Sequence, residues 1–254
     1  MNRCNQLITA GAASSQRLFT EWPLWNRYPA LTHQLKVTNV GAGAVSNEYI
    51  SRAITKQILS TKLNPLVISV WTSIPKLDVY IDQPILIEKI KSFNLRNFIV
   101  DIDSNIIDNG EGYWASSICQ DNEIKDAWKK YFETKTMYYV RTLEAIFNLQ
   151  TLCVLKNIPL YMFLQDDIFD LDYINNNNNL KYLYDNIDWN KLLTQVSLKK
   201  MWQDWGYFEQ DQINNPIKWS QVPRTEFHKK FFKEYIVPIL NQHALPTKFN
   251  LNLI

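Results

Sequence analysis

Short runs of hydrophobic residues alternate along the chain with longer stretches in which hydrophobic positions recur every three or four residues. The short runs are rich in β-branched and aromatic residues, which predicts buried strands, and the longer periodic stretches predict helices. The last helical stretch contains Pro238, which is expected to kink or end it. We expect strands at 6–10, 35–39, 66–71 and 160–164, and helices at 47–60, 135–156 and 225–241.

Alternation of strands and helices with short connections predicts a parallel sheet covered on both faces, hence an α/β domain that spans 1–254. Such sheets bind ligands where their strands end. Three small or polar loops follow strands, and we expect residues 11–15, 43–47 and 71–73 to line one pocket. Residues 100–135 are polar and irregular, and we expect them to form an insertion or lid over that edge.

Composition excludes several classes of protein. Hydrophobic residues make up 46% of the 254 residues, enough for a large core, and the net charge of +2 comes without a basic stripe, which argues against nucleic acid as a partner. The three cysteines are widely spaced, so we expect neither a disulfide framework nor a metal site, and a reducing compartment. We find no apolar run that predicts a secretory signal or a membrane span, and therefore expect a soluble protein. The loop "GAGAVSN" (41–47) lacks the glycine spacing of a dinucleotide site, and we expect no cofactor.

Several stretches carry candidate chemistry. The turn "LITAGAASS" (7–15) follows the first predicted strand, and its hydroxyls belong to Ser14 and Ser15, which could supply a nucleophile or cap the following helix. His228, near the start of the last predicted helix, could be a base or a packing histidine. "QDDIFD" (165–170) could form a metal or acid–base site, or a solvated loop. "NNNNN" (175–179) predicts a flexible loop.

An ordered set of segments resembles the SGNH/GDSL hydrolase family, especially its divergent members from phages of marine bacteria. The resemblance implies a flavodoxin-like three-layer α/β/α sandwich and ester hydrolysis, often on acylated sugars or lipids. No single motif is highly specific, but the set covers nearly the whole chain. The segments are "ITAG" (8–11), "TEWP" (20–23), "TNVGAGAVSNEYISRAI" (38–54), "NPLVISVWTSIPKLDVY" (64–80), "LEAIFNLQTLCVLKNIPLYMFLQDDI" (143–168), "NIDWNKLL" (186–193) and "VPRTEFHKKFFKEYIVPIL" (222–240).

The positions that carry catalysis in that family are substituted here. The family mechanism uses a Ser after the first strand and a His held by an Asp three residues before it. The matching residues are Ala13, Val222 and Trp219, none of which supplies that chemistry, and His228 matches a second histidine that is not the base.

The oxyanion-binding positions of the family are altered but retain hydrogen-bond donors. In that family backbone N–H groups and an Asn side chain hold the oxyanion. The matching residues here are Ala13, Ala44 next to Gly43, and Thr72 or Ser73, with Asn47 at the end of the same pocket-forming loop.

Two functions follow from this resemblance. The first is a catalytically degenerate member that acts as a binding or structural protein in a phage particle or its host-recognition apparatus, located in the virion or the host cytoplasm. Its ligand would be an acylated carbohydrate or another small ester, and its partners phage structural proteins. The alternative is an active serine esterase or carbohydrate deacetylase that uses a displaced Ser14 or Ser15 with His228.

Overall fold

Four parallel strands form the central sheet of the protein. The computed structural model describes residues 3–11, 28–41, 46–74, 78–81, 113–116, 130–131, 133–205 and 225–246. The strand order is β2-β1-β3-β6, which follows the flavodoxin-like pattern with β6 in the fourth place. The register aligns Ile8 of β1 with Thr38 of β2 and with Val67 of β3, while Ser69 of β3 aligns with Met162 of β6. The strands are β1 (Gln6–Ala10), β2 (Lys36–Asn39), β3 (Pro65–Trp71) and β6 (Leu160–Leu164).

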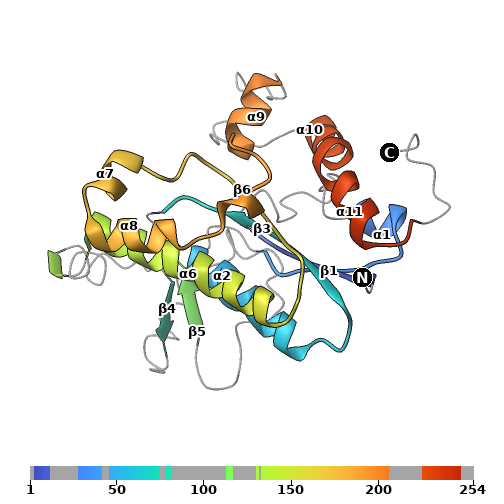
Figure 1. Ribbon diagram of the computed structural model, residues 1–254, viewed down its shortest axis with the longest axis horizontal. Helices are drawn as coiled ribbons and strands as arrows, with labels where there is room; N and C mark the ends of the chain where they lie inside the picture. The colour runs from blue at the N-terminus through green and yellow to red at the C-terminus, as the bar shows by residue number, and fades with distance from the viewer. Residues whose placement is uncertain are drawn as a thin grey trace, which may run out of the picture.

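Helices cover both faces of this sheet, and the chain has a three-layer α/β/α fold (Figure 1). One face carries α2 (Asn47–Ser60), α6 (Lys135–Leu155), α7 (Leu171–Asn175), α8 (Asn178–Asp185) and the 3-10 helix η5 (Trp189–Lys191). The other face carries α1 (Tyr28–Thr32), α9 (Leu198–Asp204), α10 (Thr225–Phe231), the π-helix η6 (Phe232–Ile236) and α11 (Val237–His243).

The alternation of side chains along the central strands divides the core in two. In β3, Val67 and Trp71 face α2 and α6, whereas Leu66, Ile68 and Val70 face the helices of the other layer. All five of these side chains have no exposed surface. This two-sided burial explains why β3 is a continuous hydrophobic run.

Local sequence signals fix where the helices of the first layer begin. The Ser46 hydroxyl accepts a hydrogen bond from the Tyr49 N–H at the start of α2, and the Thr134 hydroxyl accepts one from the Met137 N–H at the start of α6. These side chains satisfy N–H groups that have no partner within the helix. The helix starts predicted from sequence at 47 and 135 are confirmed.

The predicted parallel sheet and its four strands are confirmed, with shifts of one residue at the start of β2 and of β3. The expectation that all four strands are buried is wrong for β2. Lys36 and Asn39 at its two ends are exposed because β2 is an edge strand. Hydrophobic content alone does not distinguish an edge strand from a central one.

The structure adds detail to three further expectations. At Pro238, which was expected to kink or end the last helix, the helix type changes: a π-helical turn precedes it, and Pro238 is the second residue of α11. The asparagine run is not a loop, because α7 extends through Asn175 and the Asn177 side chain caps α8. The 100–135 segment, expected to be an insertion or lid, contains strand β5 (Tyr113–Ser116), which pairs antiparallel with β4 (Asp78–Ile81), and its role as a lid stays a prediction.

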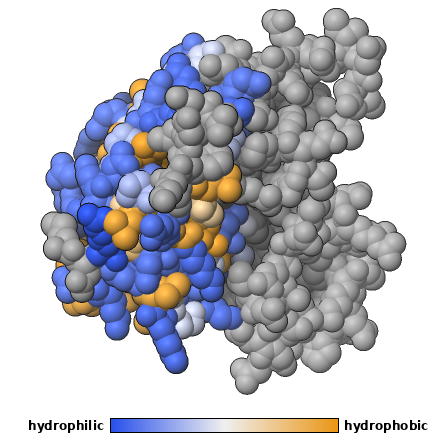
Figure 2. Space-filling model, turned by 90° about the vertical axis from the view of Figure 1, so that its right-hand side faces the viewer, coloured by the Kyte–Doolittle hydropathy of each residue, from blue (hydrophilic) through white to orange (hydrophobic). Residues whose placement is uncertain are grey.

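The surface of the described residues carries hydrophobic side chains in separate patches between hydrophilic ones on the face shown in Figure 2. Among the largest exposures are those of Val154 and Leu155 at the end of α6. Within the described ranges, no helix combines the length and the apolar character needed to cross a membrane.

Candidate functional site

The carboxyl ends of the strands meet at one edge of the sheet. β1 ends at Ala10 and is followed by buried Gly11, and β3 ends at Trp71 beside the end of β6. The Gln165 N–H donates to the Trp71 carbonyl at 2.7 Å, which holds the segment after β6 against the end of β3. Ligands of open parallel sheets bind at this edge.

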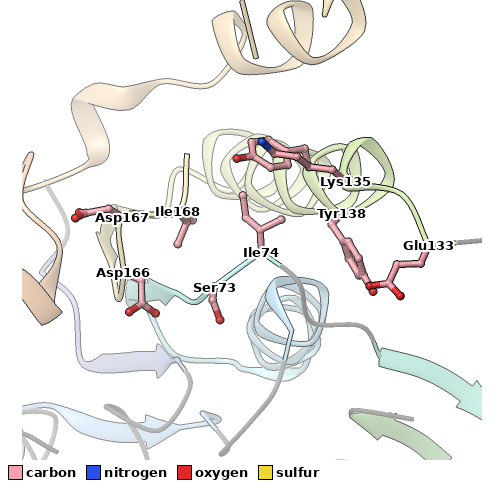
Figure 3. Close-up of a pocket in the computed structure, with 9 residues that line it drawn as sticks. Ser73, Ile74, Glu133, Lys135, Tyr138, Asp166, Asp167 and Ile168 are labelled. Atoms are coloured by element: carbon pink, nitrogen blue, oxygen red, sulfur yellow. The ribbon is translucent and has the colours of Figure 1, made fainter. Parts of the chain in front are cut away.

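A cavity of about 430 Å³ lies at this edge, over the ends of β3 and β6 and against the start of α6 (Figure 3). Its volume falls in the range of small-molecule sites. Ile74 lies near its middle, Asp166 lies beside Ser73 at one end, and Glu133 lies beside Tyr138 at the other. The lining residues are Ser73, Ile74, Glu133, Lys135, Tyr138, Tyr139, Asp166, Asp167 and Ile168.

An ion pair fixes the start of α6 on the rim of the cavity. The Lys135 ammonium donates to Asp170 Oδ2 at 2.7 Å and lies 4.0 Å from the centre of the Tyr173 ring. The hydrogen bond from Lys135 lowers the pKa of Asp170, and the same bond raises the pKa of Lys135. The Tyr139 hydroxyl accepts a hydrogen bond from the Asp170 N–H at 3.0 Å, so the wall formed by Lys135 and Tyr139 is tied to the segment before α7.

The carboxylates of the cavity differ in their partners. Asp166 pairs with Lys199 at 3.5 Å, and both side chains are about one-third exposed. Glu133, at the opposite end, makes no hydrogen bond or ion pair with another described residue. Asp166 is thus partly neutralised, Glu133 has no partner among the described residues, and Asp167 is the third carboxylate of the lining.

Asn47 and Thr72 join the start of α2 to the end of β3. The Asn47 Nδ2 donates to the Thr72 carbonyl at 3.0 Å and approaches the Thr142 hydroxyl at 3.2 Å, and the Thr72 N–H donates to Asn47 Oδ1 at 2.8 Å. Both residues are almost fully buried. The polar atoms of the Asn47 side chain are thus engaged within the protein and set the distance between two loops of the edge.

Replacing Asn47 by Ala should lower the free energy of unfolding by about 2 kcal/mol. The substitution leaves the buried Thr72 N–H and carbonyl without these partners, and an unsatisfied buried group costs about 1–3 kcal/mol. Urea unfolding followed by circular dichroism measures the change. Asn148→Ala on the exposed face of α6 is the control and should change stability by less than about 0.5 kcal/mol. Equal effects of the two variants would contradict a structural role for the Asn47 amide.

His228 lies in the helical layer on the other side of the sheet from the cavity. His228 is 1% exposed, its ring contacts the Phe227 ring, and burial lowers its pKa to about 4. Its Nδ1 is buried and has no hydrogen-bond partner in the described part of the chain. His228 is therefore a neutral imidazole at pH 7, and no described carboxylate orients it.

The helix that carries His228 runs from the carboxyl edge to the opposite edge. Phe231 packs on Phe163 near the end of β6, at 4.8 Å between ring centres, and the His243 carbonyl at the far end of α11 accepts from the Cys4 N–H before β1. His228 precedes Phe231 by nearly one turn and so lies nearer the carboxyl edge. It is not among the residues that line the cavity.

The structure brings together only part of the predicted site. Ser73 lines the cavity, and Asn47 and Thr72 lie buried beside it, bonded to each other. Apart from His228, the remaining predicted site residues lie outside the described residues, and their roles stay predictions: Ala13, Ser14, Ser15, Gly43, Ala44, Trp219 and Val222.

Sequence reasoning missed the side of the cavity that α6 contributes. Glu133 and Lys135 belong to the 100–135 segment that was expected to cover the edge, but neither was singled out. Asp166 and Asp167 belong to "QDDIFD", for which an acid–base or metal site was one reading. Among the described residues, no group of three or more His, Cys, Asp and Glu side chains is arranged to hold a metal ion.

Three comparisons with known proteins find no match for this chain. No family model matches it, and neither the curated proteins nor the solved structures contain a match.

Proposed function

We propose that this protein binds a small polar ligand in the cavity over β3 and β6 and does not hydrolyse it. The observation that carries the proposal is the cavity itself: it has the volume of a small-molecule site, lies at the carboxyl edge of a parallel sheet, and is lined by charged and tyrosine side chains. As a degenerate relative of SGNH hydrolases, the protein would keep the ligand site of such a fold without its triad. The acylated carbohydrate or small ester expected from the resemblance is one ligand class to be tested in this cavity, and a phage particle is the setting that the resemblance suggests.

The environment of His228 argues for binding over hydrolysis. A general base works best with a pKa near the working pH, and burial lowers the pKa of His228 to about 4. Its place across the sheet also separates it from the cavity side chains.

A binding screen tests the proposal. The wild-type protein is heated with a panel of sugars, acylated sugars, amines and organic acids, and a ligand is recognised by a rise in the melting temperature. We expect at least one class to stabilise the protein, and Asp166→Asn and Glu133→Gln to reduce the shift. A panel without any hit, or hits that these two variants leave unchanged, would refute the cavity as the binding site.

One observation favours the second candidate function, ester hydrolysis through Ser14 or Ser15. The buried Nδ1 of His228 has no hydrogen-bond partner in the described ranges, and a neutral imidazole can accept a proton from a serine. In that case the serine would have to approach from the segment after β1, on the α10 side of the sheet.

We expect no hydrolysis of p-nitrophenyl acetate above the rate of the same protein carrying His228→Gln. Residues Ala13, Val222 and Trp219 replace the three groups that the mechanism needs. The rates of wild type, Ser14→Ala, Ser15→Ala and His228→Gln are compared after each variant is shown to fold. A wild-type rate that disappears both in one serine variant and in His228→Gln would establish the esterase and overturn the binding proposal.

A further inference from the structure

We propose that the ligand of the cavity is a linear aliphatic diamine bound as its dication. This inference rests on the proposed function, since it names the chemical class that the same cavity takes. Three features of the lining carry it: the separation of its carboxylates, its net charge, and the way the protein already binds an ammonium group at its rim.

The carboxylates stand at opposite ends of the cavity with apolar surface between them. Asp166 lies at the end formed by the segment after β6, and Glu133 at the end formed by the start of α6 (Figure 3). Ile74 lies between the two, and both Ile74 and Ile168 are more than nine-tenths buried. A ligand with a hydrocarbon middle and a hydrogen-bond donor at each end matches this arrangement, whereas a sugar would place hydroxyl groups against the isoleucines.

The net charge of the cavity favours a dication. Its lining holds three carboxylates (Glu133, Asp166 and Asp167) and one ammonium, that of Lys135. The ion-pair partners of the lining add Asp170 for Lys135 and Lys199 for Asp166. Among these described residues, negative charges outnumber positive ones by two, which favours a positively charged ligand over a neutral or anionic one.

The protein already binds one of its own ammonium groups beside this cavity. Lys135 Nζ contacts the Asp170 carboxylate at 2.7 Å and lies 4.0 Å from the centre of the Tyr173 ring, which combines an ion pair with a cation–π contact. At one end of the cavity, the Glu133 carboxylate lies beside the hydroxyl end of Tyr138, so a carboxylate and a tyrosine are again close together. Glu133 pairs with no described cation, so that position can take an ammonium group from outside the chain.

Isothermal titration calorimetry of the full chain with α,ω-diamines of three to six carbons tests the inference. We expect at least one of these diamines to bind at least tenfold more tightly than n-butylamine, because a diamine carries a second ammonium group for the second carboxylate. Glu133→Gln and Asp166→Asn should each raise the Kd about tenfold or more. Glu144→Gln, on the exposed face of α6, is the matched control and should leave the Kd within twofold.

A substitution of Lys199 should have the opposite effect on diamine binding. Lys199→Gln removes the cation that competes for Asp166 and should tighten diamine binding several-fold. Neither this variant nor the comparison of diamine with monoamine depends on the correct folding of Glu133→Gln or Asp166→Asn.

The outcomes separate this inference from the proposed function. Three results would overturn the inference that the ligand is a diamine. They are equal binding of diamine and monoamine, diamine binding that is insensitive to Glu133→Gln and Asp166→Asn, and no diamine binding at all. If a neutral sugar or an organic acid binds in the cavity instead, the diamine is wrong while the cavity remains a binding site. If nothing in the panel binds there, both proposals fail.

Discussion

Phe163→Ala should reduce the free energy of unfolding by about 3–5 kcal/mol, the largest single-residue effect that we predict. Phe163 lies in β6 without exposed surface, and its ring packs edge-on against Phe231 at 4.8 Å and against Tyr235 at 6.4 Å. Removing the ring leaves a cavity between β6 and the helical elements α10 and η6. Because domains of this kind are stable by about 5–15 kcal/mol, the variant should unfold at a much lower urea concentration.

The matched control is Phe147→Ala on the outer face of α6. Phe147 is 37% exposed, so its removal should cost about 1 kcal/mol or less. Equilibrium urea unfolding of wild type and both variants measures the difference. If the two alanine variants lost the same stability, the packing of α10 and η6 against β6 would be contradicted.

The second prediction concerns pH. The ordinary pKa of histidine is 6.5, and burial lowers the pKa of His228 to about 4 in the folded protein. Between these values the unfolded chain binds a proton that the folded chain does not, so stability falls as the pH falls through this window. The stability linked to neutral His228 is fully present above pH 6.5. The free energy of unfolding falls by about 2 kcal/mol between pH 7 and pH 4.5 because of this residue, and the total loss below pH 4 is about 3 kcal/mol.

Comparison with a non-titrating variant isolates this contribution. His228→Leu should flatten the dependence of unfolding free energy on pH by about 2 kcal/mol between pH 7 and pH 4.5. Burial also lowers the pKa of His33 and of His243, so the variant keeps part of the wild-type dependence. His243→Gln serves as a second control, since His243 is less buried and should change the slope less than His228→Leu does. Identical pH profiles of wild type and His228→Leu would show that His228 is not held neutral by burial.

The sheet could be predicted from the sequence because burial on both faces leaves an unambiguous signal. β1, β3 and β6 are continuous hydrophobic runs, and α2 shows regular spacing of Ile50, Ile54 and Ile58. Short elements without a long hydrophobic face gave no such signal. α7 and α8 are fixed by the side chains of Asp170 and Asn177 at their first turns, and a run of asparagines resembles a loop in composition alone.

The candidate site was less accessible to sequence reasoning because its walls come from distant parts of the chain. Glu133 and Asp166 are 33 positions apart in sequence and line the same cavity because α6 leads the chain away from this edge of the sheet and β6 returns it. The resemblance to hydrolases directed attention to the loops after β1 and β2, where Ser14, Ser15 and Ala44 lie outside the described residues. Ser73 of the third loop, which the resemblance selected as a binding residue, lines the cavity, and its role there stays a prediction. The sequence could not show that the Asn47 amide is bonded to Thr72.

The orientation of α11 relative to α10 depends on the number of residues in the π-helix η6 between them. The Val237 N–H donates to the Phe232 carbonyl, so this turn holds one residue more than an α-turn. Deleting one residue between 232 and 236 would restore regular α-helix and rotate α11 by about 100° relative to α10. Ile239 and Leu240, now buried, would then turn away from the sheet. Related sequences should therefore conserve the number of residues between Phe231 and Ile239 more strictly than the identity of the residues in between.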